Sequence, residues 1–331
     1  MASLATTFDR WRPGPRFELW VQERVRRRRG PLDLPLTLEY RHVYVMPTVF
    51  GAWFGGLLVM LLLGGLNFNN NMALLMGFLL GAIAQITTLL VYRNLVGLTV
   101  TTIAAEPVFA GEQARFRIYL KNPEPRHRFA LQARMGDTAD TCDIGPQETT
   151  HLVLRQPAPR RGWLDMPAFR LENRYPLGLF RAWSVMIPRT RCLVYPTPHP
   201  HPPPLPRTGR GDEGTAKAGE GDHFHGLREY RAGDPLRMIA WRASARHGRL
   251  FAREMETPQE QACELNWYLM GEGDTETRLS ILTAWILRAE RQQIPYALEL
   301  PTDALPANLG DEHRDACLRI LALHGHDGND R

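Results

Sequence analysis

The sequence is short of two residue types that many catalytic sites require. Lysine occurs only as Lys121 and Lys217, and neither is followed by serine or threonine. A phosphate-binding Walker A loop needs Gly-Lys-Ser/Thr, so the chain has no such site. Serine occurs four times, never within a Gly-x-Ser-x-Gly or Ser-x-x-Lys motif. These absences exclude P-loop NTPases and count against the serine hydrolases that use those motifs.

Paired cysteines are absent as well. The four cysteines lie far apart and form no Cys-x-x-Cys pair, so they indicate reduced, buried thiols rather than a zinc site or a disulfide framework. Three His-x-His pairs have no carboxylate or cysteine at a diagnostic spacing, which favours solvated loops over metal sites. We therefore expect no metal, no cofactor and no catalytic residue. The residues concerned are Cys142, Cys192, Cys263 and Cys317, and the pairs His199/His201, His223/His225 and His324/His326.

Charge is missing from the whole stretch between Val43 and Tyr92, which has no Asp, Glu, Lys, Arg or His. Within it, residues 47–66 and 72–92 are two apolar runs separated by five polar or aromatic residues. About 20 apolar residues span the roughly 30 Å hydrocarbon core as a helix. The sequence therefore predicts a transmembrane hairpin over residues 43–93.

Arginine placement predicts the orientation of this hairpin. Residues 1–42 carry nine arginines, Arg93 follows the second span, and the connecting loop has none. By the positive-inside rule both termini face the cytoplasm. We expect a two-pass protein of the bacterial inner membrane, with residues 1–42 as a basic cytoplasmic segment.

This basic segment has two interpretations. Between Arg16 and Arg28, Phe17, Trp20, Val21 and Val25 recur at helical spacing, which is typical of an amphipathic helix lying on anionic inner-leaflet lipid. The other interpretation is a disordered tail that only sets the topology. No recognised nucleic-acid-binding module accompanies the arginines, so we expect no nucleic-acid partner.

Residues 97–196 have a period-two pattern. Phe116, Ile118 and Leu120 alternate with polar or half-polar positions, and turn clusters separate about seven such runs. This pattern predicts an antiparallel β-sandwich, with Trp163, Trp183 and residues 175–180 supplying its aromatic core and one corner. Residues 197–221 are rich in proline and then glycine, which indicates a linker.

Residues 222–331 begin with an arginine-rich segment that we take as the candidate site. Between residues 222 and 256 there are seven arginines and five acids. Asp234 is a good N-cap and Pro235 suits the first helical position, so residues 235–246 are a predicted helix. The predicted binding surface comprises Arg228, Glu229, Tyr230, Asp234, Arg237, Trp241, Arg242 and Arg246. These arginines either bind an acidic partner or a phosphate, or pair with the neighbouring acids and stabilise the segment; the near balance of charge favours internal pairing for most.

The rest of the chain has an α/β pattern. It predicts strands at Cys263–Met270 and Ile294–Leu300 and helices at residues 274–293 and 311–324. A strand–helix–strand order implies a parallel, right-handed crossover. Overall, the sequence predicts a membrane-anchored α+β protein with a two-helix hairpin, an antiparallel sandwich and a small α/β module.

The run Gly226-Leu227-Arg228-Glu229-Tyr230, Gly233-Asp234, Arg237, Ile239, Trp241, Ala245-Arg246 and Gly248 resembles the signature of the bacterial "domain of unknown function 58" family. The order of the parts along the chain is also similar to that of the family: two spans come first, then a β-rich domain containing Tyr-Pro-Leu-Gly-Leu-Phe, and then the signature. The resemblance implies association with a MoxR-type AAA+ ATPase and with membrane-anchored transglutaminase-like proteins. It also implies a shortened von Willebrand factor type A-like region after the signature, and no enzymatic activity.

One property of type A domains does not carry over. Their Mg²⁺ site uses Asp-x-Ser-x-Ser, a set of oxygen ligands suited to a hard cation. The corresponding stretch here is Leu265–Met270, and no Ser-x-Ser occurs anywhere in the chain.

We therefore expect a non-catalytic scaffold or adaptor that works with the ATPase in assembling or maturing envelope or protein complexes. The alternatives are an enzyme with His223, His225 and Asp234 in a cleft, or a regulatory membrane protein that binds phosphate or nucleic acid through the arginine-rich signature.

Overall fold

The computed structural model describes residues 33–206, 224–229, 244–245, 251–255, 262–270 and 273–325. The chain divides into two compact units, one formed by residues 1–195 with 325–331 and the other by residues 196–324. The predicted N-terminal amphipathic helix and most of the linker lie outside the described residues.

The first unit contains two antiparallel sheets that enclose one apolar core, as the alternating sequence pattern predicts. Phe116, Ile118 and Leu120 of one sheet and Leu131 and Leu171 of the other are fully buried in the same cluster. In order across the first sheet, the strands are β1 (Leu36–Thr37), β3 (Thr99–Ala105), β5 (Gln113–Lys121) and β8 (Thr149–Pro157). The second sheet consists of β2 (Tyr44–Pro47), β11 (Phe180–Met186), β10 (Phe169–Asn173), β6 (Arg128–Met135) and β7 (Thr138–Ile144).

A third, small sheet ends the first unit. Its central strand β12 pairs in parallel with β4 and antiparallel with β9. The bounds are β4 (Val108–Phe109), β12 (Arg191–Tyr195) and β9 (Gly162–Asp165). The parallel pair departs from the purely antiparallel arrangement that the turn spacing predicts.

Two strands lie before the first hairpin helix: β1 within the predicted basic segment 1–42, and β2 at the start of residues 43–93, where the sequence predicts the hairpin. β1 pairs with β3, and β2 pairs with β11. The chain thus enters both sheets, leaves as the hairpin, and returns to the sandwich at β3. These strands are two and four residues long, too short for a period-two pattern to reveal them.

The aromatic core was predicted only in part. Trp183 is buried, but Trp163 is 42% exposed, and Tyr175 and Leu177 are 41% and 53% exposed. These three side chains therefore lie on the surface and not in the core. Most of the core volume comes from aliphatic residues of the alternating strands.

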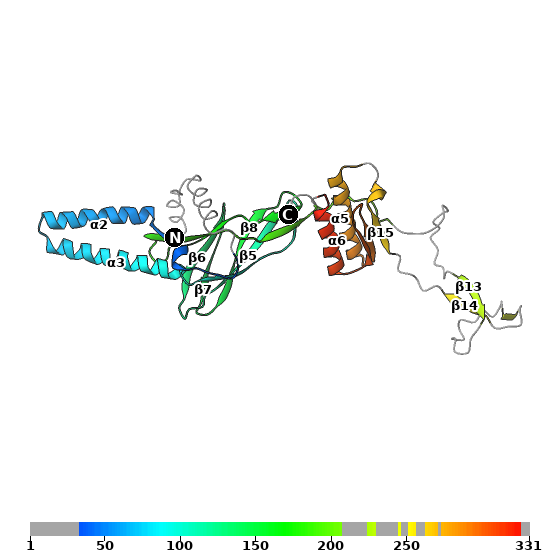
Figure 1. The fold of residues 1–331 in the computed structure, drawn as a ribbon, viewed down its shortest axis with the longest axis horizontal. Coiled ribbons are helices and arrows are strands. Elements are labelled where there is room, and N and C mark those ends of the chain that lie inside the picture. Colours follow the sequence, from blue (N-terminus) through cyan, green and yellow to red (C-terminus); the bar gives the residue numbers. More distant parts are fainter. Residues whose placement is uncertain are drawn as a thin grey trace. The chain divides into compact units, whose positions relative to one another are not determined.

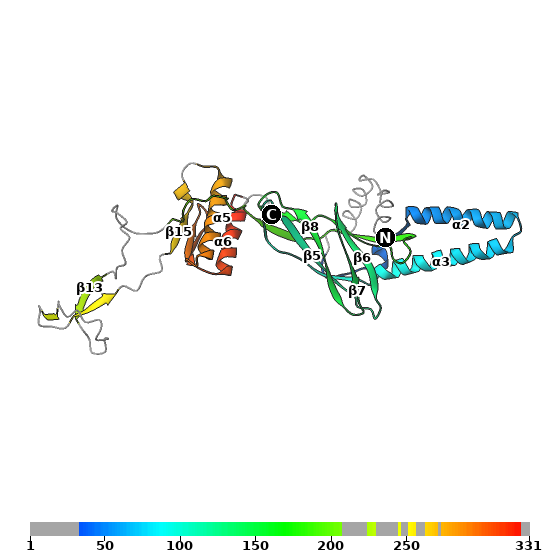
Figure 2. The ribbon, with the colours of Figure 1, turned by 180° about the vertical axis from the view of Figure 1, so that it is seen from behind.

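The hairpin consists of α2 (Val49–Asn67) and α3 (Asn71–Leu95), which lie side by side in both views (Figures 1 and 2). Both are long and apolar enough to cross a membrane. The Asn70 side chain caps α3 by accepting from the amides of Met72 and Ala73 at 3.1 and 3.2 Å. A Cβ at Gly77 would come within 2.5 Å of Leu62, so glycine allows the two helices to pack closely.

The second unit contains an α/β sheet with two helices beside it (Figure 1). β15 (Cys263–Asn266) pairs in parallel with β16 (Tyr296–Glu299), as the strand–helix–strand pattern predicts. β17 (Ala304–Asn308), which the sequence pattern did not reveal, adds to β16 antiparallel. The helices are α5 (Thr275–Arg291) and α6 (Asp311–Leu323). A short 3-10 helix replaces the second half of the predicted first strand at Trp267–Met270.

Candidate functional site

The predicted binding surface on the arginine-rich signature, which we call the signature surface, lies largely outside the described residues. Arg228 and Glu229 belong to β13 (Phe224–Glu229), which pairs antiparallel with β14 (Phe251–Met255). Ser244 and Ala245, within the predicted helix, are helical. Tyr230, Asp234, Arg237, Trp241, Arg242 and Arg246 lie outside the described residues, so their role as a binding surface stays a prediction.

The described part of the chain contains a different polar site, where the hairpin meets the sandwich. We call it the hairpin junction. Its members come from the starts of α2 and β6, the end of α3, the loop after β5 and the turn between β10 and β11. They are Thr48, Gly51, Asn94, Asn122, Glu124, Arg126, Arg128, Phe129, Gly178 and Leu179.

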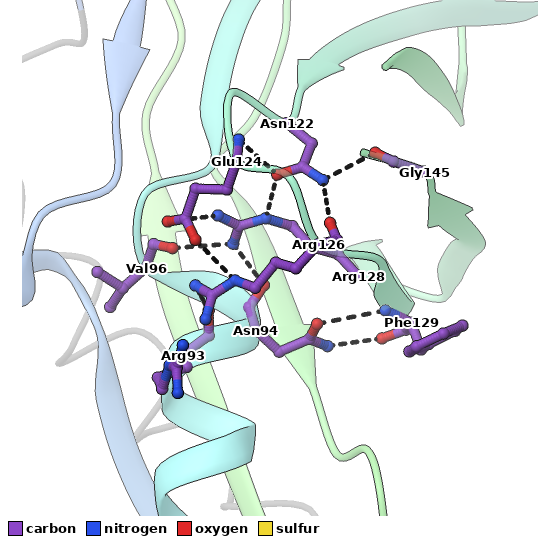
Figure 3. A network of polar contacts seen from close by, with 9 residues as sticks. All are labelled: Arg93, Asn94, Val96, Asn122, Glu124, Arg126, Arg128, Phe129 and Gly145. Carbon is purple, nitrogen blue, oxygen red and sulfur yellow. Dashed lines mark hydrogen bonds and ion pairs between the residues drawn. The ribbon is translucent and has the colours of Figure 1, made fainter. Parts of the chain in front are cut away.

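The centre of the junction is Arg128, the first residue of β6, which is fully buried. Its guanidinium donates to the carbonyl oxygens of Asn94 and Val96, both at 2.8 Å, and to Oδ1 of Asn122 at 2.7 Å (Figure 3). The last carbonyls of a helix have no partner within it and carry partial negative charge. A buried cation at the end of α3 therefore satisfies these acceptors and complements the helix dipole.

The Glu124 carboxylate is a counter-ion of Arg128. Nη2 of Arg128 lies 3.2 Å from Oε1 of Glu124, and that carboxylate also pairs with Nε of Arg126 at 2.7 Å. Burial lowers the pKa of Arg128 to about 10, while the Glu124 carboxylate opposes the shift. A pKa near 10 keeps the guanidinium charged at neutral pH. Arg126 adds a bond of 2.6 Å to the Arg93 carbonyl.

A side-chain amide makes a second link to α3. Asn94 donates to the carbonyl of Phe129 at 2.7 Å and accepts from the amide of the same residue at 3.2 Å (Figure 3). Asn173 of β10 donates to that Phe129 carbonyl at 2.6 Å. Val91 and Leu95 on the same helix are fully buried in the sandwich core. The last turns of α3 are thus part of the sandwich itself.

The first helix has its own attachment. Thr48 is the N-cap of α2. Its hydroxyl donates to the carbonyl oxygen of Gly178 at 2.6 Å, and its backbone amide donates to the carbonyl oxygen of Leu179 at 2.9 Å. A Cβ at Gly51 would overlap the Leu179 carbonyl oxygen. Gly178 has φ +70°, a conformation that favours glycine. The turn that carries the Tyr-Pro-Leu-Gly-Leu-Phe run therefore holds the start of α2.

A buried carboxylate supports this turn. Glu172 at the end of β10 has a side chain that is 2% exposed, and three arginines lie 3.5 to 3.9 Å from its oxygens. They come from β6, the turn and β11, as Arg134, Arg174 and Arg181. Ion pairs from three elements fix the position at which the chain leaves β10.

The described residues offer little redox or metal chemistry. Among them, no group of three or more His, Cys, Asp or Glu side chains is placed to hold a metal ion. Burial raises the pKa of the Cys142 and Cys317 thiols to about 12, so both are poor nucleophiles at neutral pH. At the carboxyl end of β15, Asn266 donates to Glu299 at 2.6 Å.

Residues 226–278 match the family described as "Protein of unknown function DUF58". This segment of the chain is thus similar to the DUF58 family. This confirms the resemblance drawn from the signature, over a stretch that runs from β13 into α5. The DUF58 description assigns no activity, and it leaves the ATPase association and the type A-like region as predictions. No curated protein and no solved structure matches the chain.

The hairpin junction, by contrast, was missed by the sequence reasoning. Arg128 stands in Arg126-His127-Arg128 beside a proline-containing turn, which in a single sequence looks like solvated surface. Its burial depends on residues 34 positions earlier, at the end of α3. A period-two or helical pattern carries no information about such a long-range partner.

Proposed function

We propose that this chain is a non-catalytic, two-pass protein of the bacterial inner membrane. It holds its sandwich directly on the transmembrane hairpin and presents the signature surface to a MoxR-type AAA+ ATPase. The observation that carries the proposal is the hairpin junction, because polar bonds and shared core fix the membrane helices to the sandwich. An adaptor with this build holds its sandwich in a fixed position on the membrane helices.

Membrane insertion is supported by the exposure of the helices. Leu57, Met60 and Phe78 are 62%, 74% and 68% exposed. A soluble protein would bury most of these side chains, since a contiguous exposed apolar surface is an aggregation hazard. Resistance of the full-length chain to alkaline carbonate extraction would support insertion, and release into the soluble fraction would contradict it.

The cytoplasmic orientation rests on arginine. Arg93 in the last turn of α3 and Arg126 beside it lie at the sandwich end of the hairpin, whereas the tip at Phe68–Asn70 is uncharged. The positive-inside rule places the sandwich in the cytoplasm. A cytoplasm-active reporter fused after Arg331 should be active, and activity of a periplasm-specific reporter at that point would reverse the topology.

The ATPase partner is tested at the signature. We expect the double variant Arg242→Glu with Arg246→Glu to abolish capture of the ATPase while leaving the thermal unfolding temperature unchanged. Arg115→Glu, an exposed arginine on β5, is the matched charge reversal and should leave capture intact. A fall in unfolding temperature in the double variant would instead support internal pairing of these arginines. The same capture experiment tests the transglutaminase-like partner.

The non-catalytic role has a direct measurement. Metal analysis of the purified full-length protein should give no stoichiometric transition metal. A stoichiometric metal lost on substitution of His223 or His225 would overturn the proposal and favour the enzyme alternative, with Asp234 in its site.

A further inference from the structure

We propose that the turn at residues 175–179 is a membrane-contacting element, whose Tyr175 and Leu177 side chains lie at the boundary between lipid headgroups and acyl chains. This inference rests on the proposed membrane insertion of the hairpin. It gives the sandwich a direct contact with the bilayer in addition to its covalent connection.

The length of α2 sets the position of the membrane surface. Its 19 residues rise about 1.5 Å each, or roughly 28 Å in total, against a hydrocarbon core of about 30 Å. The whole of α2 is therefore needed to cross the core. Its N-cap Thr48 consequently lies at the boundary of the hydrocarbon region and not in the cytoplasm beyond it.

The longer helix α3 indicates the same plane independently. Its 25 residues rise roughly 37 Å, which exceeds the core by about 7 Å, or about five residues. If the residues of α3 are counted from the hairpin tip at Asn71, the part of the helix beyond the hydrocarbon core begins near residue 91. Exposure changes there: Leu89 and Leu90 are 53% and 43% exposed, whereas Val91 and Leu95 are fully buried in the sandwich. The sandwich thus begins where the hydrocarbon core ends.

The turn lies at this plane because it binds the N-cap of α2. Thr48 bonds to the carbonyls of Gly178 and Leu179, and Gly51 in the first helical turn approaches the Leu179 backbone. Leu177, one residue before these attachments, is 53% exposed, and Tyr175 is 41% exposed. The turn contacts the start of a membrane span. The exposed apolar side chain of Leu177 therefore lies close to the lipid around that span.

Aromatic neighbours support an interfacial location. The rings of Phe129 and Tyr175 lie 5.0 Å apart, and Phe129 is held against the end of α3 by Asn94. Across the hairpin base, Tyr40 stacks on Tyr92 at 6.1 Å. Tyrosine is enriched at the membrane–water interface because its ring is apolar and its hydroxyl is polar.

The turn is also held in a fixed conformation before any contact with lipid. Asn173 accepts from the amide of Tyr175 at 3.0 Å, and the Gly178 amide donates to the Arg174 carbonyl at 2.9 Å. The buried Glu172 pairs with Arg174 at the start of the turn. A preorganised turn loses little conformational entropy on contact with the bilayer.

Depth-dependent fluorescence quenching tests the proposal on the full-length protein in nanodiscs of phosphatidylcholine and phosphatidylglycerol. A Cys142→Ala background removes the partly exposed thiol, and the other three cysteines are buried. An environment-sensitive fluorophore is placed at Leu177→Cys. The matched control is Gln113→Cys, an exposed residue about 30 Å away along β5 from Asn122 in the hairpin junction. A reference label at Leu57→Cys reports the hairpin.

We expect lipids spin-labelled near the headgroup to quench the label at residue 177 severalfold more than the label at residue 113. Equal, weak quenching at 177 and 113 with strong quenching at 57 would overturn the membrane contact and leave the membrane anchoring intact. Absence of quenching at residue 57 as well would overturn the anchoring and the contact together. Unchanged unfolding temperatures of the labelled variants ensure that the folded protein is compared.

Discussion

Replacing Arg128 tests whether the hairpin junction joins the hairpin to the sandwich. Arg128→Met keeps most of the side-chain length but removes every donor. Two acceptors then lose their partner, the carbonyls of Asn94 and Val96, whereas Oδ1 of Asn122 keeps the amide of Glu124 at 3.3 Å. Leaving a buried acceptor unsatisfied costs about 1–3 kcal/mol, so the gross loss for the two carbonyls is roughly 2–6 kcal/mol.

Part of this loss is offset because the variant no longer buries a charge. Removing one member of a buried charged network costs about 3–5 kcal/mol in other proteins, and we expect that range here. With about 2–4 °C per kcal/mol for a domain of this size, the unfolding temperature should fall by roughly 6–20 °C. Arg128→Lys keeps the charge but presents fewer donors from a single point, so its loss should be smaller.

The assay is thermal unfolding of the detergent-solubilised full-length protein, followed by circular dichroism. Arg126→Met is the matched control, because its side chain is 28% exposed and water can replace its bond to the Arg93 carbonyl. It should cost less than about 1 kcal/mol. Equal destabilisation by Arg128→Met and Arg126→Met would refute the argument that buried carbonyls at the end of α3 require Arg128.

Three further variants or conditions test separate parts of the structure. Gly51→Ala should destabilise the protein by about 1–3 kcal/mol in the same unfolding assay, because its Cβ overlaps the Leu179 carbonyl. The control Gly55→Ala places its Cβ where nothing lies within 4 Å, so it should be neutral or slightly stabilising. Equal effects of the two variants would contradict the close approach of Gly51 to Leu179. Asn94→Ala removes both bonds to the Phe129 backbone and should cost about 2 kcal/mol in that assay, and an unchanged unfolding temperature would show that the amide is dispensable. Burial, aided by Asp140 and Asp143, raises the pKa of Cys142 from 9.0 to about 12. The folded state therefore favours the neutral thiol, and its contribution to stability is present below pH 9 and is lost between pH 9 and pH 12. Alkylation of Cys142 should be slow at pH 8 and should rise about tenfold per pH unit past pH 9, and a plateau near pH 9 would contradict the shifted pKa.

The sequence predicts the hairpin and the sandwich core well because both follow from local patterns. The predicted spans at residues 47–66 and 72–92 compare with helices at Val49–Asn67 and Asn71–Leu95. Uncharged runs of that length have few alternatives to a spanning helix. The alternating residues of β5 and β8 are buried as expected, because one face of each strand packs on the core.

The errors and omissions have a common physical cause, which is pairing between residues far apart in the chain. β1 and β2 are strands only because β3 and β11 provide their partners. The end of α3 continues past the predicted boundary because the sandwich buries Val91 and Leu95. Tyr175 and Leu177 are of residue types common in cores, yet they are exposed, because they lie on a turn whose position Thr48 and Glu172 fix.

These long-range pairings make the hairpin an insertion into the sandwich instead of an anchor attached to one end of it. The strand before α2 belongs to one sheet and the strand after α3 to the other. Each helix is bonded to the sandwich at its own end, α2 through Thr48 and α3 through Arg128 and Asn94. A tether with one attachment leaves a domain free to rotate, whereas two attachments in different sheets restrain both its tilt and its rotation. A partner that pulls on the sandwich would therefore transmit force to both hairpin helices, which suits the adaptor role proposed above.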